Sequence, residues 1–151
     1  MEVATLTLNT DGVARTSAGL VHARLRIDVG NKKFPDPNWT DFAVVVLSWW
    51  CKGLTRLVTE EDTSVEIRFM DGPFLARVDA REKTSWELCL IRRLRTDRIE
   101  YLGEIDSGPL LDSVVTSAET VILLCKDRGW ISRDTEDLER SLSELKYIRG
   151  I

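Results

Sequence analysis

Three consecutive segments of alternating apolar and polar residues, joined by short connections, constrain the fold of this chain most. They are residues 64–70, 74–80 and 85–93. Apolar side chains at every second position give one buried face, which is the period of a β-strand. The connections at 71–73 and 81–83 are too short to carry a chain back to a parallel neighbour. The three segments are therefore predicted to pair as an antiparallel meander.

Further strands are expected before and after this meander. Residues 3–9 and 21–29 alternate in the same way and predict a hairpin, whose connection at 11–19 is small and polar and predicts a loop. Within 21–29 the polar face includes His22, which we expect to meet solvent. Residues 98–105 alternate more weakly and predict a last strand beside the meander.

Three segments have the 3.6-residue period of a helix. The first runs from Trp39 to about Val58, with Asn38 as the expected N-cap, and is apolar around so much of its circumference that it is predicted to be central. The second opens at 107–109 and closes at Gly129. The third is expected to be capped by Asp134 or Thr135 and carries one narrow leucine seam.

This order of segments predicts an α+β fold in a single domain over residues 1–151. We expect an antiparallel sheet of about five or six strands, with a long central helix and two C-terminal helices packed on one face. Apolar residues make up 43% of the chain, enough for a core of that size.

Charge, apolar stretches and cysteine spacing indicate which partners and which cell compartment to expect. The net charge is −4, and the one basic cluster, 92–95 with Arg98, is followed by acidic residues, so nucleic acid is not expected as a partner. The N-terminus lacks a signal-peptide pattern and the apolar stretch 42–50 is too short to span a bilayer, so no membrane partner is expected. Three cysteines without CxxC spacing predict buried thiols in a cytoplasmic protein.

No set of residues in the sequence has the spacing of a catalytic, cofactor or metal site. One histidine and three scattered cysteines do not predict a zinc site or a Cys–His pair, and no glycine-rich phosphate loop is present. The chain is therefore predicted to bind rather than catalyse, without a cofactor. A cleft that collects His22, an arginine and a carboxylate in three dimensions would favour an enzyme or ligand-binding domain instead.

Surface acids and tryptophans are the candidate contact residues. Trp49 and Trp50 are adjacent, so they point about 100° apart on a helix and one of them is expected to reach a rim. The last helix has an acidic outer face, and two further acidic groups are the predicted partner-binding residues, namely Glu60, Glu61 and Asp62, and Glu100, Glu104 and Asp106.

Three stretches of the chain, together covering roughly residues 34–145, carry a resemblance to a known class of protein. They are Phe34 to Phe42 leading into the helix with Trp49-Trp50, the Arg68 to Phe74 turn followed by Trp86-Glu87-Leu88, and Cys125 to Trp130. These framework residues resemble immunity proteins of bacterial polymorphic-toxin systems, of the contact-dependent growth-inhibition or Rhs type.

The resemblance implies a cytosolic protein that binds one cognate toxin domain and blocks it by stoichiometric occlusion. An acidic inhibitor would be steered towards a basic toxin cleft. The alternative is a different interaction or scaffold module, either a monomer or a homodimer. No contact residue is transferred by the resemblance, because framework residues such as Trp39, Asp71 and Gly72 carry a fold and not an interface.

Overall fold

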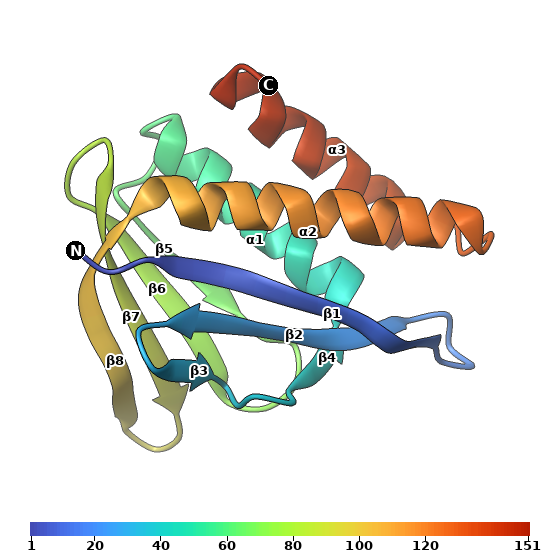
Figure 1. The fold of residues 1–151 in the computed structure, drawn as a ribbon, viewed down its shortest axis with the longest axis horizontal. Coiled ribbons are helices and arrows are strands. Elements are labelled where there is room, and N and C mark those ends of the chain that lie inside the picture. Colours follow the sequence, from blue (N-terminus) through green and yellow to red (C-terminus); the bar gives the residue numbers. More distant parts are fainter.

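A computed structural model describes residues 1–151 and contains two antiparallel four-stranded sheets and three helices (Figure 1). The strands and helices, in chain order, are β1 (Ala4–Arg15), β2 (Val21–Val29), β3 (Lys32–Phe34), β4 (Thr40–Phe42), α1 (Ala43–Val58), β5 (Ser64–Arg68), β6 (Phe74–Ala80), β7 (Ser85–Arg93), β8 (Asp97–Asp106), α2 (Ser107–Asp127) and α3 (Arg133–Arg149).

The α+β class and the meander are confirmed. We call the sheet with strand order β5-β6-β7-β8 sheet A, and every neighbouring pair in it is antiparallel. The weakly alternating segment at 98–105 is its fourth strand. A bulge between Leu90 and Ile91 interrupts the pairing of β7 with β8, which explains why the alternation of β8 is irregular.

The prediction of one sheet of five or six strands is wrong. Strands β1, β2, β3 and β4 form a separate sheet, sheet B, in which β3 and β4 both pair with β2. Backbone pairing between the two sheets is limited to a short parallel bridge between Glu2 and Ile105. The separation arises because residues 32–42 return to β2 in two short pieces, so β2 does not pair with sheet A.

Helix α1 begins later than expected. Residues 40–42 pair with β2, so the helix starts at Ala43, its N-cap is Phe42, and Asn38 caps nothing. The predicted loop at 11–19 is also too long, because β1 continues to Arg15 after a register shift. In both places the chain pairs with β2, although the local sequence favours a helix at 40–42 and a loop at 11–15.

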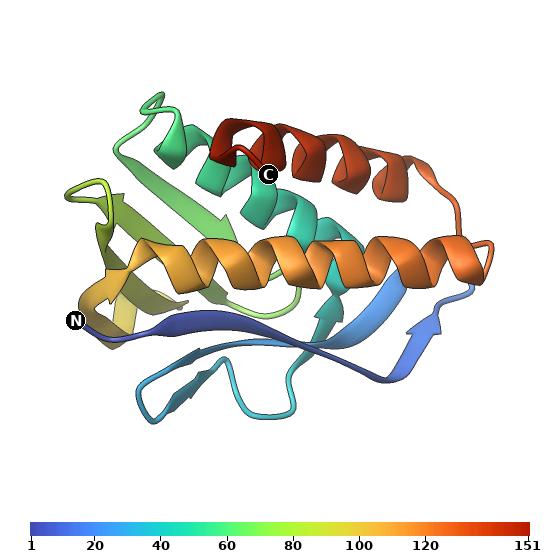
Figure 2. The ribbon, with the colours of Figure 1, turned by 45° about the horizontal axis from the view of Figure 1, so that its top comes forward.

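The helices build a second and a third layer. Helix α1 packs against β2 and β5, α2 packs against β1, and α3 packs chiefly against α1 and α2 (Figures 1 and 2). At the contact of α1 with β5, a Cβ on Gly53 would lie 2.9 Å from Cδ1 of Ile67, so the glycine permits close approach. The expectation that both C-terminal helices pack on the sheet fails for α3, which rests on other helices.

The expected cap of α3 is wrong, because the helix begins earlier and neither Asp134 nor Thr135 is its N-cap. Ser132 is the N-cap and forms a reciprocal capping box with Thr135, whereas Asp134 lies in the first turn. Helix α2 is long and apolar enough to cross a membrane by length and composition alone. Its apolar stripe, which includes Leu110, Val114 and Ala118, is buried against β1, α1 and α3 in the main core.

Candidate interaction surface

One face of sheet A is covered by no helix. Because side chains alternate along a strand, Val65, Val78 and Leu88 point into the main core and their neighbours point away from it. We call the side chains that point away the outer face. Across the four strands they include Ser64, Glu66, Arg68, Leu75, Arg77, Asp79, Glu87, Cys89, Ile91, Arg93, Ile99, Leu102 and Glu104.

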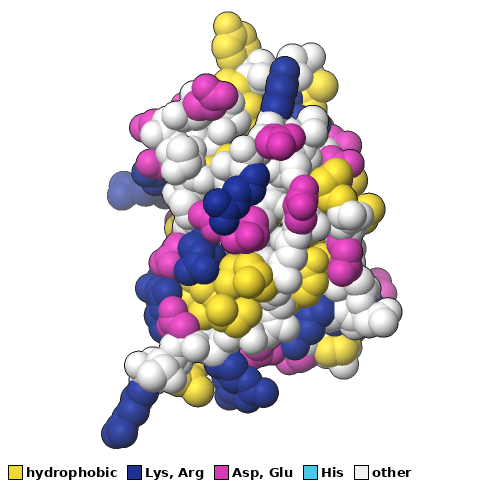
Figure 3. Space-filling view, turned by 90° about the vertical axis from the view of Figure 1, so that its left-hand side faces the viewer, with side chains coloured by type: hydrophobic (Ala, Val, Ile, Leu, Met, Phe, Trp, Pro, Cys, Tyr) yellow, Lys and Arg dark blue, Asp and Glu magenta, His cyan; other side chains and the backbone are white.

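The centre of the outer face is apolar. Leu75, Cys89 and Ile91 are at most 1% exposed and form a small cluster separate from the main core. Beside them on β8, Ile99 and Leu102 are each 54% exposed. Figure 3 views the molecule from the side of sheet A and shows apolar side chains gathered there, with charged groups of both signs around them. A sheet face with a small core of its own and exposed apolar residues beside it is typical of a contact surface.

A row of carboxylates crosses the outer face at one end of the apolar centre. Asp79 is the cross-strand partner of Glu87, and Glu87 is the partner of Glu104. Like charges in directly opposite positions repel. Arg77 lies 3.7 Å from Asp79 and Arg81 lies 3.0 Å from Glu87. Arginines thus offset two members of the row.

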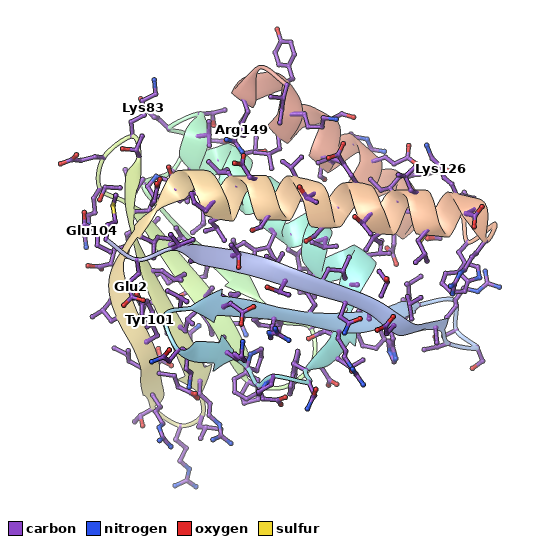
Figure 4. All side chains as sticks on the ribbon, viewed as in Figure 1. Glu2, Lys83, Tyr101, Glu104, Lys126 and Arg149 are labelled. Carbon is purple, nitrogen blue, oxygen red and sulfur yellow. The ribbon has the colours of Figure 1, made fainter.

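Glu104 is the member of this row without a cation. Its side chain accepts a hydrogen bond from the hydroxyl of Ser85 and takes part in no ion pair. It projects from the end of β8, on the side of the molecule where Lys83 and Glu2 also lie (Figure 4). Its negative charge is therefore available to a partner.

At the opposite end of the outer face, Arg93 forms ion pairs with two carboxylates. The guanidinium contacts both carboxylate oxygens of Glu66 at 3.2 Å and lies 2.9 Å from Asp97. Hydrogen bonds from Arg93 lower the pKa of Glu66 and of Asp97 and raise that of Arg93 itself. Arg68, which lies two residues after Glu66 on the same face of β5, forms no ion pair within the chain. The outer face is thus acidic at one end and carries arginines at the other.

The structure does not bring the six predicted acidic residues into one surface. Glu60 and Glu61 are exposed in the turn between α1 and β5, where Glu60 has a positive φ of 60°. Asp62 forms an ion pair with Arg56 of α1. This first group lies beside the edge of sheet A, outside the outer face.

The second group divides among three environments. Glu100 pairs with Lys32 of β3 at 2.8 Å, and the carboxylate of Asp106 caps α2 by accepting from the N–H of Gly108. Only Glu104 belongs to the row of carboxylates on the outer face. Sequence reasoning missed Asp79, Glu87 and Leu102, although β7 is apolar on both of its faces, which is the signal that the second face also packs.

The remaining candidate groups are the histidine, the cysteines and the adjacent tryptophans, and each packs at least partly within the fold. His22 is half-buried with its ring edge-on to Phe42, 4.4 Å between ring centroids, and lines neither the hollow beside Leu20 and Ser132 nor the groove between α1 and β5. All three thiols are buried, as predicted, and burial raises the pKa of Cys51 to about 12. Trp50 is fully buried whereas Trp49 is half-buried and lines a groove beside β5, so the expected division of the two tryptophans is confirmed.

Comparison with known proteins identifies no relative of this chain. No family model matches the chain, and neither a curated protein nor a solved structure matches it. The first two of the three stretches that carry the resemblance meet in space. Phe74 packs edge-on to Phe34 and to Trp39, at centroid distances of 5.5 and 5.1 Å, and Asp41 accepts from the N–H of Asp71. These residues hold the two sheets together, and the immunity role stays a prediction.

Proposed function

We propose that this chain is a non-enzymatic binding protein that neutralises a cognate bacterial toxin domain by stoichiometric contact, with the outer face of sheet A as the contact surface. The observation that carries the proposal is the uncovered sheet face with its apolar centre and its row of carboxylates. The immunity role itself rests on the resemblance of the framework residues.

The surface favours a partner with a basic rim around an apolar centre. Exposed Ile99 and Leu102 supply area to desolvate, and desolvated apolar side chains near the middle of an interface contribute most of its affinity. Glu104, which has no cation of its own, supplies an unpaired charge beside them. Carboxylates at a rim chiefly raise the association rate and its dependence on salt.

The test is a titration of the purified chain with the product of the adjacent gene, together with a measure of whether co-expression removes that product's toxicity. We expect roughly 1:1 binding. Leu102→Asp should weaken the affinity by about 100-fold, because it places a charge among the exposed apolar side chains beside the apolar centre. Glu104→Lys should slow association and reduce its salt dependence.

The matched control is the double charge reversal of Glu60→Lys with Glu61→Lys, which lies outside the outer face. Unchanged binding by this control, with loss in Leu102→Asp, supports the outer face as the contact surface. Loss of binding in the control with none in Leu102→Asp would move the contact to the turn between α1 and β5. Absence of binding and of protection by the unaltered chain would overturn the proposed function.

A further inference from the structure

Strand β5 forms one edge of sheet A, and its backbone has open hydrogen-bonding positions. The N–H of Ala80 donates to the carbonyl of Thr63, and the N–H of Phe69 donates to the carbonyl of Phe74. In an antiparallel pair only alternate residues exchange hydrogen bonds. Residues 63 and 69 bond to β6, so the residues between them at every second position, 65 and 67, bond to β6 as well. The backbone groups of Ser64, Glu66 and Arg68 therefore point away from the sheet.

These backbone groups find no partner elsewhere in the chain. No hydrogen bond outside the ladders of the sheet involves the backbone of Ser64, Glu66 or Arg68. Three N–H groups and three carbonyls in a row are a template for another strand. The edge can therefore accept an extended segment in an antiparallel or parallel pairing.

Space for such a segment exists on the helix side of the edge. A groove of about 400 Å³ lies between α1 and the first residues of β5, and is lined by Trp49, Lys52 and Arg56 of the helix and by residues 64–66 of the strand. Trp49 is half-buried there. Helix α1 therefore leaves the edge of β5 open at residues 64–66.

The side chains of β5 on the outer face make it complementary to itself. Glu66 and Arg68 carry opposite charges two residues apart, and Arg68 lacks an ion-pair partner within the chain. If two copies of β5 pair antiparallel about Ile67, Glu66 of each copy lies opposite Arg68 of the other. Pairing about Glu66 or about Arg68 would place like charges opposite each other, which is unfavourable.

We propose that two copies of this chain associate through β5, antiparallel and centred on Ile67, to form a continuous sheet of eight strands. This joins the four strands of each sheet A. A second copy is favoured over a foreign peptide because the Glu66 and Arg68 charges make β5 complementary to itself in antiparallel pairing. The outer faces of both copies stay uncovered in this dimer, so its existence does not depend on the proposed function.

The test is the mass of the protein by sedimentation over a concentration series. We expect the unaltered chain to be a dimer. Arg68→Glu alone and Glu66→Arg alone should each weaken association by about tenfold or more, because each places like charges opposite each other in both symmetric pairs. An equimolar mixture of the two variants should form a heterodimer, in which all four charges are again matched.

A backbone variant separates strand pairing from side-chain effects. Arg68→Pro removes an N–H that points away from β6, so it should leave the fold intact and abolish the dimer. Arg68→Gln keeps the N–H and should keep most of the association. A monomeric unaltered chain, a dimer that persists in Arg68→Pro while its thermal unfolding is unchanged, or variants that fail to associate when mixed would each overturn the proposal. Toxin binding by a monomeric Arg68→Pro would leave the proposed function standing.

Discussion

The carboxylate of Asp41 accepts a hydrogen bond from the backbone N–H of Asp71 at 3.2 Å, which ties β4 of sheet B to the turn that precedes β6 of sheet A. The same carboxylate accepts from Nε1 of Trp39 at 2.9 Å and from the N–H of Phe42 at 2.7 Å. Asp41 is 2% exposed and has no cation beside it. Three donors, from the segment around β4 and from the turn before β6, thus converge on one buried side chain.

Replacing this carboxylate should be costly. Asp41→Ala leaves three donors without their acceptor in a buried place, and we expect the free energy of unfolding to fall by about 3 kcal/mol. Chemical denaturation measures the change. Asp71→Ala is the control, because Asp71 contributes only its backbone N–H and its side chain is exposed, so its effect should stay within about 0.5 kcal/mol. Equal losses in the two variants would contradict this role.

The small cluster on the outer face should contribute to stability although no helix covers it. Ile91 is 1% exposed, so Ile91→Ala is expected to lower the free energy of unfolding by about 2–4 kcal/mol. Leu102, 54% exposed beside it, should cost less than about 1 kcal/mol as Leu102→Ala. The same denaturation experiment compares them. A cost for Ile91 as small as that for Leu102 would mean that the cluster is not packed.

The thiols should be unreactive in the native state. Cys51, Cys89 and Cys125 are buried, and burial raises the pKa of each thiol because the thiolate loses its hydration. An aromatic disulfide reagent at pH 8 should label none of them in the folded chain and all three after unfolding. Rapid labelling of one thiol under native conditions would show that its region opens readily.

The contact of Asp137 with Lys52 should make stability depend on pH. The hydrogen bond from Lys52, at 2.7 Å, and that from Ser48 lower the pKa of Asp137 below its ordinary value of 3.8. The folded chain then binds fewer protons at this group than the unfolded chain. Its contribution to stability is complete above about pH 4 and is lost as the pH falls through the lowered pKa.

Asp137→Asn tests this dependence. The difference in unfolding free energy between the unaltered chain and this variant should be largest near neutral pH and should shrink on acidification below about pH 4. Glu144→Gln on the exposed side of α3 is the matched control and should show no such trend. A difference that is constant down to pH 2 would contradict the assignment.

The start of α3 distinguishes the cap seen in the structure from the residue beside it. Ser132→Ala removes the acceptor for the N–H of Thr135 and should cost about 1 kcal/mol of unfolding free energy. Asp134→Ala, in the first turn, should change it by no more than about 0.5 kcal/mol. A larger loss for Asp134 would show that its charge at the helix terminus matters more than the capping box.

The sequence by itself determined the local elements of this protein. The meander of β5, β6 and β7, the strand β2 and the long helices follow from apolar periodicity and short connections, because these depend on neighbours close in the chain. Burial of the thiols and the division between Trp49 and Trp50 follow from the same periodicity. The acidic residues could be identified from the sequence, but their ion-pair and hydrogen-bond partners could not.

Only the tertiary structure decided how these elements combine. Residues 32–34 and 40–42 are too short to show a period, and they become strands because β2 offers them an edge. That choice divides the strands into two sheets and leaves sheet A with an uncovered face. Asp79, Glu87 and Glu104 meet there through cross-strand register, which no spacing along the chain reveals. The candidate surface is therefore a product of strand pairing between distant segments.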